Sequence, residues 1–221
     1  MLNLKFSRQE NGIYISHTDI LRSLNRTMRR AKINVAYSQG FNRHMIIKLT
    51  QPLPLGIASL DEWATFDVID KISPEEFLKK FNDNCPPYIK GITAIETENN
   101  PSLSANVVAS GYVIKTDKAF KYKEALEDLN KKSYVITYEK KGEMISKEIS
   151  GNIHAIRVSE KDIKCVLSFG SVNLRIDNLF NQFNVDFGLD IKNVDIVRTR
   201  QLILDKNNTF ISVEQFMEKV K

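Results

Sequence analysis

The sequence contains few of the residues that hold cofactors or form disulfides. Its two cysteines, Cys85 and Cys165, lie far apart in unlike contexts among 221 residues. Because there is no CxxC pair, the sequence gives no local support to a zinc or iron–sulfur site. We therefore expect two reduced thiols that serve packing, and no metal site.

Long hydrophobic runs are also missing. No stretch of 18 or more apolar residues occurs, which argues against a membrane-spanning helix. Residues 1–12 have neither a long apolar stretch nor a small-residue cleavage pattern, so we expect no signal peptide. These absences predict a cytoplasmic protein that does not associate with membranes.

Common catalytic motifs are absent as well. The chain has no GxxxxGK[ST], no GxGxxG and no HExxH, so nucleotide hydrolysis, dinucleotide redox chemistry and zinc proteolysis have no local support. Of its three histidines, His154 lies in a predicted strand among apolar residues and is interpreted as structural. His17 either orients a helix terminus or contacts a ligand, whereas His44 follows a polar loop, where ligand-binding residues concentrate.

The remaining composition is that of a folded globular protein. Apolar residues make up 42% of the chain and charged residues 27%, which suits one large or two small cores. We predict an α+β protein of two ferredoxin-like βαββαβ-type units in tandem, residues 1–98 and 105–221, with mainly antiparallel sheets.

Hydrophobic periodicity predicts the elements of both units. In the first unit we expect strands at 2–8, 45–50, 63–69 and 89–96, with helices at 18–31 and 74–82. In the second unit we expect strands at 107–116, 134–140, 144–150, 152–159, 163–169 and 194–204, with helices at 121–131, 176–183 and 212–221.

Positive charge is concentrated near the start of the chain. Residues 1–60 contain nine Lys or Arg and two acids, a net charge of +7, whereas the whole chain carries +5. The remaining residues therefore carry −2. A localised positive excess attracts anionic ligands, and nucleic acid is the commonest large polyanion in a cell.

The predicted helix at 18–31 has two opposed faces. Ser16 with Asp19 forms a capping pattern at its start. At 100° per residue the apolar side chains fall on one side and four arginines fall nearly opposite: Arg22, Arg26, Arg29 and Arg30. Such arginines are often only a solvated face, but Asp19 is the one acid between Asn11 and Leu60, so we favour a phosphate or an acidic protein as their partner.

A polar loop follows this helix and is the second candidate binding feature. Gly40 permits a positive φ angle, Asn42 favours a turn, and Arg43 adds a fixed charge. Phe41, with Tyr37, either offers a stacking surface for nucleotide bases or anchors the loop in the core. The predicted ligand loop comprises Ser38, Gln39, Gly40, Phe41, Asn42 and His44.

Several blocks of residues 8–70 together resemble a known family. The blocks are Ile15-Ser16-His17-x-Asp19, Arg29-Arg30-Ala31, Tyr37-Ser38-Gln39-Gly40-Phe41-Asn42-x-His44 and Pro52-Leu53-Pro54-Leu55-Gly56. In this order they are similar to the radical-SAM-linked protein family, a conserved domain of unknown function. The family loop usually has prolines where this chain has Arg43 and Met45.

The resemblance implies an association with radical-SAM enzymes rather than a reaction. This chain has no cysteine trio, so the iron–sulfur cluster and S-adenosylmethionine would be bound by a separate partner. We expect an RNA-binding or substrate-presenting accessory module that works with such an enzyme in tRNA or rRNA modification or ribosome-related processing. Phosphates would contact Arg22, Arg26, Arg29, Arg30 and Arg43.

Two alternatives come from other functional classes. One is a metal-independent RNA-processing enzyme in which His17 or His44 acts as general acid or base. The other is a protein-interaction scaffold that uses the basic face without binding RNA.

Overall fold

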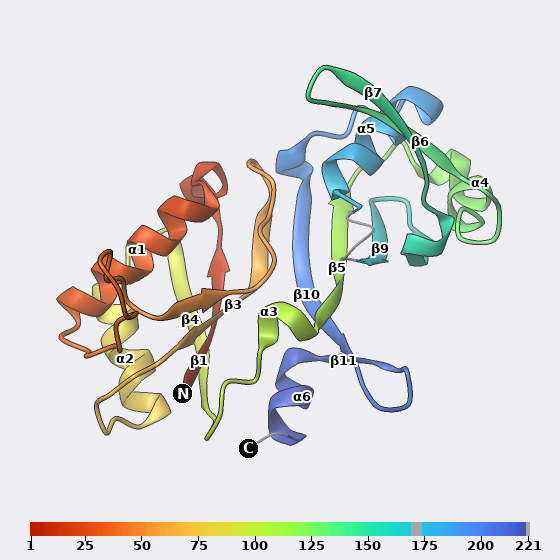
Figure 1. Cartoon of the computed structure of the whole chain (residues 1–221). Coiled ribbons are helices and arrows are strands. Elements are labelled where there is room, and N and C mark those ends of the chain that lie inside the picture. The colour runs from red at the N-terminus through yellow and green to blue at the C-terminus, as the bar shows by residue number, and fades with distance from the viewer. Residues whose placement is uncertain (169–173, 220–221) are drawn as a thin grey trace. The chain divides into compact units, whose positions relative to one another are not determined.

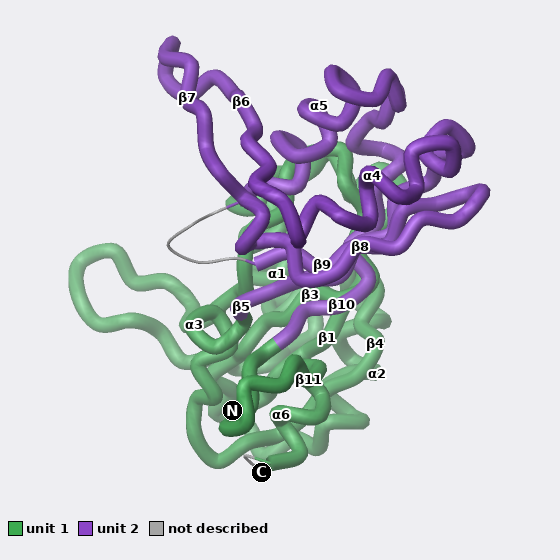
Figure 2. Tube along the Cα trace, turned by 90° about the vertical axis from the view of Figure 1, so that its right-hand side faces the viewer, with its two compact units in different colours: residues 1–107, 203–221 green, residues 108–202 purple. Residues whose placement is uncertain are grey.

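The computed structural model describes residues 1–168 and 174–219. It is a mixed α+β structure with mostly antiparallel strand pairing, as the sequence predicted. The chain forms two compact units (Figure 2). Unit 1 comprises residues 1–107 and 203–221, and unit 2 comprises residues 108–202.

Unit 1 starts with the element order that the sequence predicted. Its elements are β1 (Leu2–Arg8), the 3-10 helix η1 (Glu10–Tyr14), α1 (His17–Arg30), β2 (Ile47–Leu49), β3 (Ala58–Phe66), α2 (Pro74–Asn84), β4 (Ile89–Glu96) and α3 (Leu103–Asn106), followed after unit 2 by β11 (Phe210–Ser212) and α6 (Val213–Lys219). The strand order is β4-β1-β3-β2, and these neighbouring strands are antiparallel.

Helices α1 and α2 cover one face of this sheet (Figure 1). Alternate residues of β1, namely Leu2, Leu4 and Phe6, point into the core beneath them. From α2, Phe77 packs its ring 5.4 Å from that of Phe66 in β3. This packed core fixes the position of α1 on the sheet.

The faces of α1 follow the predicted helical period. Ile20, Leu24 and Met28 are buried, whereas the arginines are exposed. The Ser16 side chain caps the helix, because its Oγ accepts a hydrogen bond from the Asp19 backbone N–H at 3.1 Å. The helix therefore presents a fixed row of arginines to solvent.

The other face of the sheet contains a network of charges. Lys5 of β1 lies 3.2 Å from the Asp61 carboxylate of β3 and also donates to Glu214 of α6. The indole of Trp63 donates to the same Asp61 carboxylate at 2.8 Å. We call Lys5, Asp61 and Glu214 the Lys5 network.

The Lys5 network bears on the assignment of residues 203–221. The sequence prediction placed them in the second unit, but they belong to unit 1. Val213 and Met217 of α6 are buried, and Glu214 pairs with Lys5. Such contacts between distant parts of the chain leave no periodic signal in the sequence.

Unit 2 contains a four-stranded arrangement and a separate hairpin. Its elements are β5 (Val107–Lys115), η2 (Phe120–Tyr122), α4 (Lys123–Glu127), β6 (Val135–Lys140), β7 (Glu143–Glu148), η3 (Ser150–Asn152), β8 (Ile153–Val158), β9 (Asp162–Ser168), α5 (Ile176–Phe187), η4 (Asn193–Asp195) and β10 (Ile196–Leu204). The strand order is β10-β5-β9-β8, and β6 pairs with β7 in a hairpin that extends from the rest of the unit (Figure 2).

Some of the observed elements differ from those predicted. Strand β3 begins at Ala58 rather than at 63, because Asp61 is accommodated inside the strand by Trp63 and Lys5. The helix predicted at 121–131 is shorter, since the chain turns after Glu127. Strand β11 was not predicted, and the predicted positions at 169 and 220–221 lie outside the described residues.

Candidate functional site

A shallow groove on unit 1 brings most of the predicted arginines together. It has a volume of about 300 Å³ and lies between the exposed face of α1 and the end of the loop 38–44. We call it the arginine groove. Its lining residues are Arg22, Asn25, Arg26, Arg29, Arg43, His44 and Met45.

The groove is strongly cationic. No carboxylate is among its described lining residues. At the edge of the groove, Arg22 forms an ion pair with Asp19 at 2.8 Å. Hydrogen bonds to Asp19, chiefly from Ser16 and secondly from Arg22, lower the pKa of its carboxyl group. In the part of the chain that the structure describes, the side chains of Arg26 and Arg29 make no hydrogen bond or ion pair, so both guanidinium groups keep their donors available.

The spacing of these arginines follows from helix geometry. With a rise of about 1.5 Å per residue, Arg26 lies about 6 Å along the axis from Arg22, and Arg29 about 4.5 Å further. A row of planar, five-donor groups at such intervals suits a ligand with repeated anionic oxygens.

Arg30 does not belong to the groove. Its Nε and Nη2 donate to the carbonyl of Asn84, the last residue of α2, at 3.0 and 2.5 Å. A cation at this position satisfies a free carbonyl and complements the negative end of the helix dipole. The structure therefore uses Arg30 to join α1 to α2.

The loop 38–44 is closed at its base by hydrogen bonds. Tyr37 and Met45 form an isolated antiparallel bridge, and the Ser38 N–H donates to the His44 carbonyl at 2.9 Å. In return the His44 N–H donates to Ser38 Oγ at 3.2 Å. Gly40 has a φ angle of +111°, so the turn uses a conformation that favours glycine.

The tip of this loop faces solvent. Gln39, Gly40, Phe41 and Asn42 are all exposed. Phe41 is fully exposed, at 110% of its reference area, so it does not anchor the loop in the core. Arg43 lies with its guanidinium carbon 6.0 Å from the centre of the exposed Tyr37 ring.

His44 lies in the groove, and His17 does not line it. Nδ1 of His44 lies 3.0 Å from Ser38 Oγ and 3.2 Å from the Asn42 carbonyl oxygen. Because a carbonyl can only accept, the second contact favours a proton on Nδ1 and a lone pair on Nε2. His17 is exposed at the first residue of α1.

Sequence reasoning missed two residues of the groove. Asn25 lies three residues after Arg22 and four before Arg29, so its place on the same helical face was available from the period of the helix. Met45 reaches the groove through its pairing with Tyr37, for which the sequence gives no signal.

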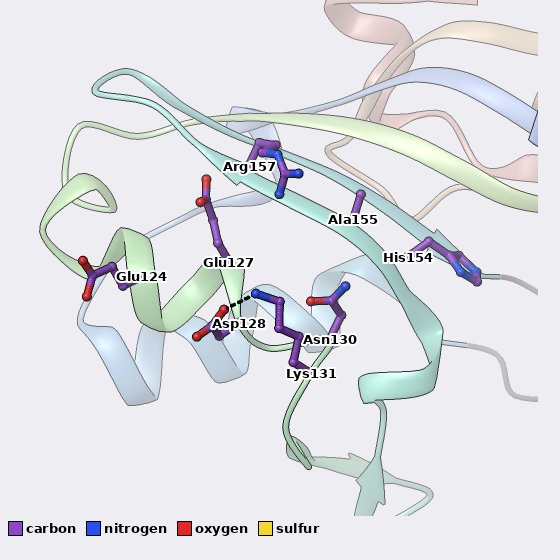
Figure 3. Close-up of a pocket in the computed structure, with 8 residues that line it drawn as sticks. All are labelled: Glu124, Glu127, Asp128, Asn130, Lys131, His154, Ala155 and Arg157. Carbon is purple, nitrogen blue, oxygen red and sulfur yellow. Dashed lines mark hydrogen bonds and ion pairs between the residues drawn. The ribbon is translucent and has the colours of Figure 1, made fainter.

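A second hollow, of about 400 Å³, lies in unit 2 between α4 and β8 (Figure 3). Its charges largely satisfy one another or the backbone. Lys131 pairs with Asp128 at 2.8 Å, and Glu127 accepts from the Val158 N–H at 2.8 Å. It therefore lacks the excess of cations found in the arginine groove.

His154 lies at the edge of this second hollow. It is in a strand, as predicted, but its side chain is exposed rather than surrounded by apolar residues. Its ring is turned away from the α4 side chains (Figure 3), and its Nε2 lies 2.5 Å from Ser168 Oγ. Partial burial lowers the pKa of His154.

In residues 1–168 and 174–219, no three His, Cys, Asp or Glu side chains gather where they could hold a metal ion. Over the same ranges, no helix has the length and apolar character needed to cross a bilayer. Cys85 and Cys165 are free thiols, and burial raises the pKa of each.

Comparison with known proteins identifies the family. The model of the family DUF2344, described as an uncharacterized protein conserved in bacteria, matches residues 1–177. The chain belongs to the DUF2344 family. The DUF2344 match includes the whole arginine groove and ends just inside α5. A search of curated proteins gave no match.

Proposed function

We propose that this DUF2344 protein binds RNA, and that the arginine groove of unit 1 holds the phosphates. The observation that carries the proposal is the convergence of Arg22, Arg26, Arg29 and Arg43 in one groove whose described lining contains no carboxylate. Like charges held this close repel one another, and a bound polyanion relieves the repulsion. Phosphate contacts position the RNA, while Asn42 and His44 at the loop contact its distinguishing feature.

The wider proposal is an accessory role. The resemblance of residues 8–70 to the radical-SAM-linked protein family supports a partner that carries the iron–sulfur cluster and S-adenosylmethionine. In this proposal the present chain presents a tRNA, an rRNA or a ribosome-associated target to that enzyme. The exposed position of the loop 38–44 supports such presentation, because bound RNA would remain accessible from solvent.

We also infer that both units have the ferredoxin-like arrangement. Unit 1 has the order β1-α1-β2-β3-α2-β4 with strands in the order β4-β1-β3-β2. Without the β6–β7 hairpin, unit 2 has the order β5-α4-β8-β9-α5-β10 with strands in the corresponding order β10-β5-β9-β8. The repeated order supports one ancestral plan for the two units.

RNA binding is tested by fluorescence anisotropy with labelled cellular tRNA and rRNA fragments. The test variant carries Arg22→Gln, Arg26→Gln, Arg29→Gln and Arg43→Gln. A matched control removes four exposed charges of unit 2, with Lys121→Gln, Lys140→Gln, Lys161→Gln and Lys164→Gln. We expect the arginine variant to lose at least tenfold in affinity and the control to change little. Equal affinity of the arginine variant and the wild type, or no RNA binding at low salt, overturns the proposal.

Crosslinking in the protein's own cells then identifies the RNA. We expect a discrete RNA that is recovered with the wild type and lost with the four-arginine variant. If no RNA is enriched and a radical-SAM protein is recovered through the same arginines, the basic face is a protein interface and the scaffold hypothesis replaces RNA binding.

An RNA-processing enzyme is the second candidate, and one observation favours it. His44 lines the groove with Nδ1 held by Ser38 and Asn42, which leaves Nε2 available as a general base beside arginines that would stabilise a charged phosphate. Specific cleavage of cellular RNA that is lost in His44→Ala and retained in His17→Ala supports it. Intact RNA after incubation with the purified chain argues against it.

A further inference from the structure

Phe41 has no structural role within the described chain that accounts for its position. It is the most exposed of the large apolar side chains there, at 110% of its reference area. Apolar rings are normally withdrawn from water, and an isolated one at a loop tip loses the free energy that burial provides. Covering the ring with a flat partner would remove its apolar surface from water and so recover this free energy.

The loop holds Phe41 outward rather than leaving it free to fold back. The Tyr37–Met45 bridge and the paired hydrogen bonds between Ser38 and His44 close the base of the loop. Gly40, at a φ angle of +111°, turns the chain immediately before Phe41. The ring is therefore presented from a closed turn, which lowers the entropy lost when a ligand binds.

Aromatic and cationic surfaces are continuous at this site. Arg43 lies over the Tyr37 ring, 6.0 Å from its centre, and the same Arg43 lines the arginine groove. Phe41 is two residues before Arg43 in the same loop. A ligand that contacts Phe41 with a flat group can thus place its anionic groups in the groove.

We propose that the site recognises unpaired nucleotides, with a base stacked on Phe41 and the adjoining phosphates in the arginine groove. This inference rests on the proposed function. Bases in a duplex have both faces covered by their neighbours, so a loop-tip ring reaches a base face only where the strand is unpaired. Single-stranded segments, loops and bulges are therefore the substrate class, and regular duplex RNA is not.

The first test compares a single strand with its duplex in the full chain. A labelled single-stranded oligoribonucleotide and the same strand annealed to its complement are titrated with wild type, Phe41→Ala, Phe41→Leu and Phe41→Tyr. We expect the wild type to prefer the single strand and Phe41→Ala to lose about tenfold in its affinity for it. Phe41→Leu keeps apolar surface without a ring and should lose as much, whereas Phe41→Tyr should retain wild-type affinity. Phe120→Ala, at an exposed phenylalanine of unit 2, is the matched control and should change nothing.

A spectroscopic test reports stacking directly. The chain has one tryptophan, Trp63, and it is fully buried in unit 1. Phe41→Trp therefore adds one exposed indole, whose emission should fall when a base stacks on it. In Phe120→Trp the emission should not respond to the oligonucleotide.

The outcomes separate this inference from the function on which it rests. If both forms of RNA bind equally and Phe41→Ala binds as wild type, while the four-arginine variant loses affinity, base stacking is wrong and phosphate binding stands. If the wild type binds neither form at low salt, both proposals fall. If Phe41→Ala instead loses a protein partner and keeps its affinity for RNA, the ring is a protein contact and the inference is overturned.

Discussion

At the residue scale, four arginines of one helix have two different roles. Arg22, Arg26 and Arg29 line the groove, whereas Arg30 donates to the Asn84 carbonyl at the end of α2. The helical period placed all four arginines on one face, because it indicates only the direction in which each side chain leaves the helix. It carries no information about α2, which lies more than forty residues further along the chain. Sequence therefore identified the groove arginines and also included one that supports the fold.

This division predicts opposite effects of two neighbouring substitutions. Arg30→Ala should lower the free energy of unfolding by about 0.5–1 kcal/mol, because the helix end loses its cation, and leave RNA affinity unchanged. Arg29→Ala should weaken RNA binding and leave stability within about 0.5 kcal/mol. Urea denaturation and anisotropy titration of both variants measure the two effects. Loss of RNA affinity in Arg30→Ala without loss of stability would show that Arg30 also contacts the ligand.

At the element scale, local patterns predicted the helices of unit 1 better than its strand β3. α1 and α2 have capping residues and amphipathic periods, so their predicted limits are close to those observed. Strand β3 was predicted to start five residues late, since Asp61 and Glu62 are typical of a loop. Asp61 is buried in the strand, where Trp63 and Lys5 contact its carboxylate. Sequence patterns do not report the contact with Lys5, which lies far from Asp61 along the chain.

The Lys5 network gives a pH-dependent prediction for α6. Burial opposes ionisation of Glu214, but the hydrogen bond and charge of Lys5, together with hydrogen bonds from the backbone and from Ser212, outweigh it and lower the pKa of Glu214 below its usual value of 4.5. A lowered pKa means that the ion pair contributes fully above about pH 4.5 and is lost as pH falls through the folded-state value. For Lys5, burial would lower the pKa, but Glu214 and Asp61 raise it, so the pair stays intact at neutral pH.

Glu214→Gln should therefore destabilise the protein by about 1–2 kcal/mol at pH 7. The loss is smaller than that caused by leaving a buried charge unpaired, because Lys5 still pairs with Asp61 in the variant. The difference from wild type should shrink as the pH falls below 4.5 and through the lowered pKa of Glu214. Chemical denaturation from pH 3 to 7 measures it, with Glu218→Gln on the exposed side of α6 as control. A pH-independent difference would contradict an ionic origin.

At the scale of the whole molecule, charge is distributed unevenly along the chain. Residues 1–60 carry a net charge of +7, and residues 61–221 carry −2. The groove lies within the positive segment. The uneven distribution was evident from composition. Composition did not predict the extent of the two units, because residues 203–221 join unit 1 through contacts between the two ends of the chain.

This distribution predicts a steep dependence of RNA affinity on salt. If the four groove arginines each neutralise one phosphate of a single strand, the plot of log K against log salt should have a slope of about −3. The four-arginine variant should flatten that slope by about 3, and the four-lysine control should not. Anisotropy titrations between about 50 and 300 mM salt measure both slopes. An unchanged slope would remove these arginines from the phosphate contacts.

The order of the units also has a consequence during protein synthesis. Lys5 and Asp61 emerge from the ribosome before all of unit 2, and Glu214 emerges after it. At about 5–20 residues per second, the interval between Asp61 and Glu214 is about 8–30 s. During that time nascent unit 1 lacks α6, so its folding finishes only after translation has passed through the whole of unit 2. Slow translation of the β6–β7 region should therefore prolong the period in which nascent unit 1 is a client of chaperones.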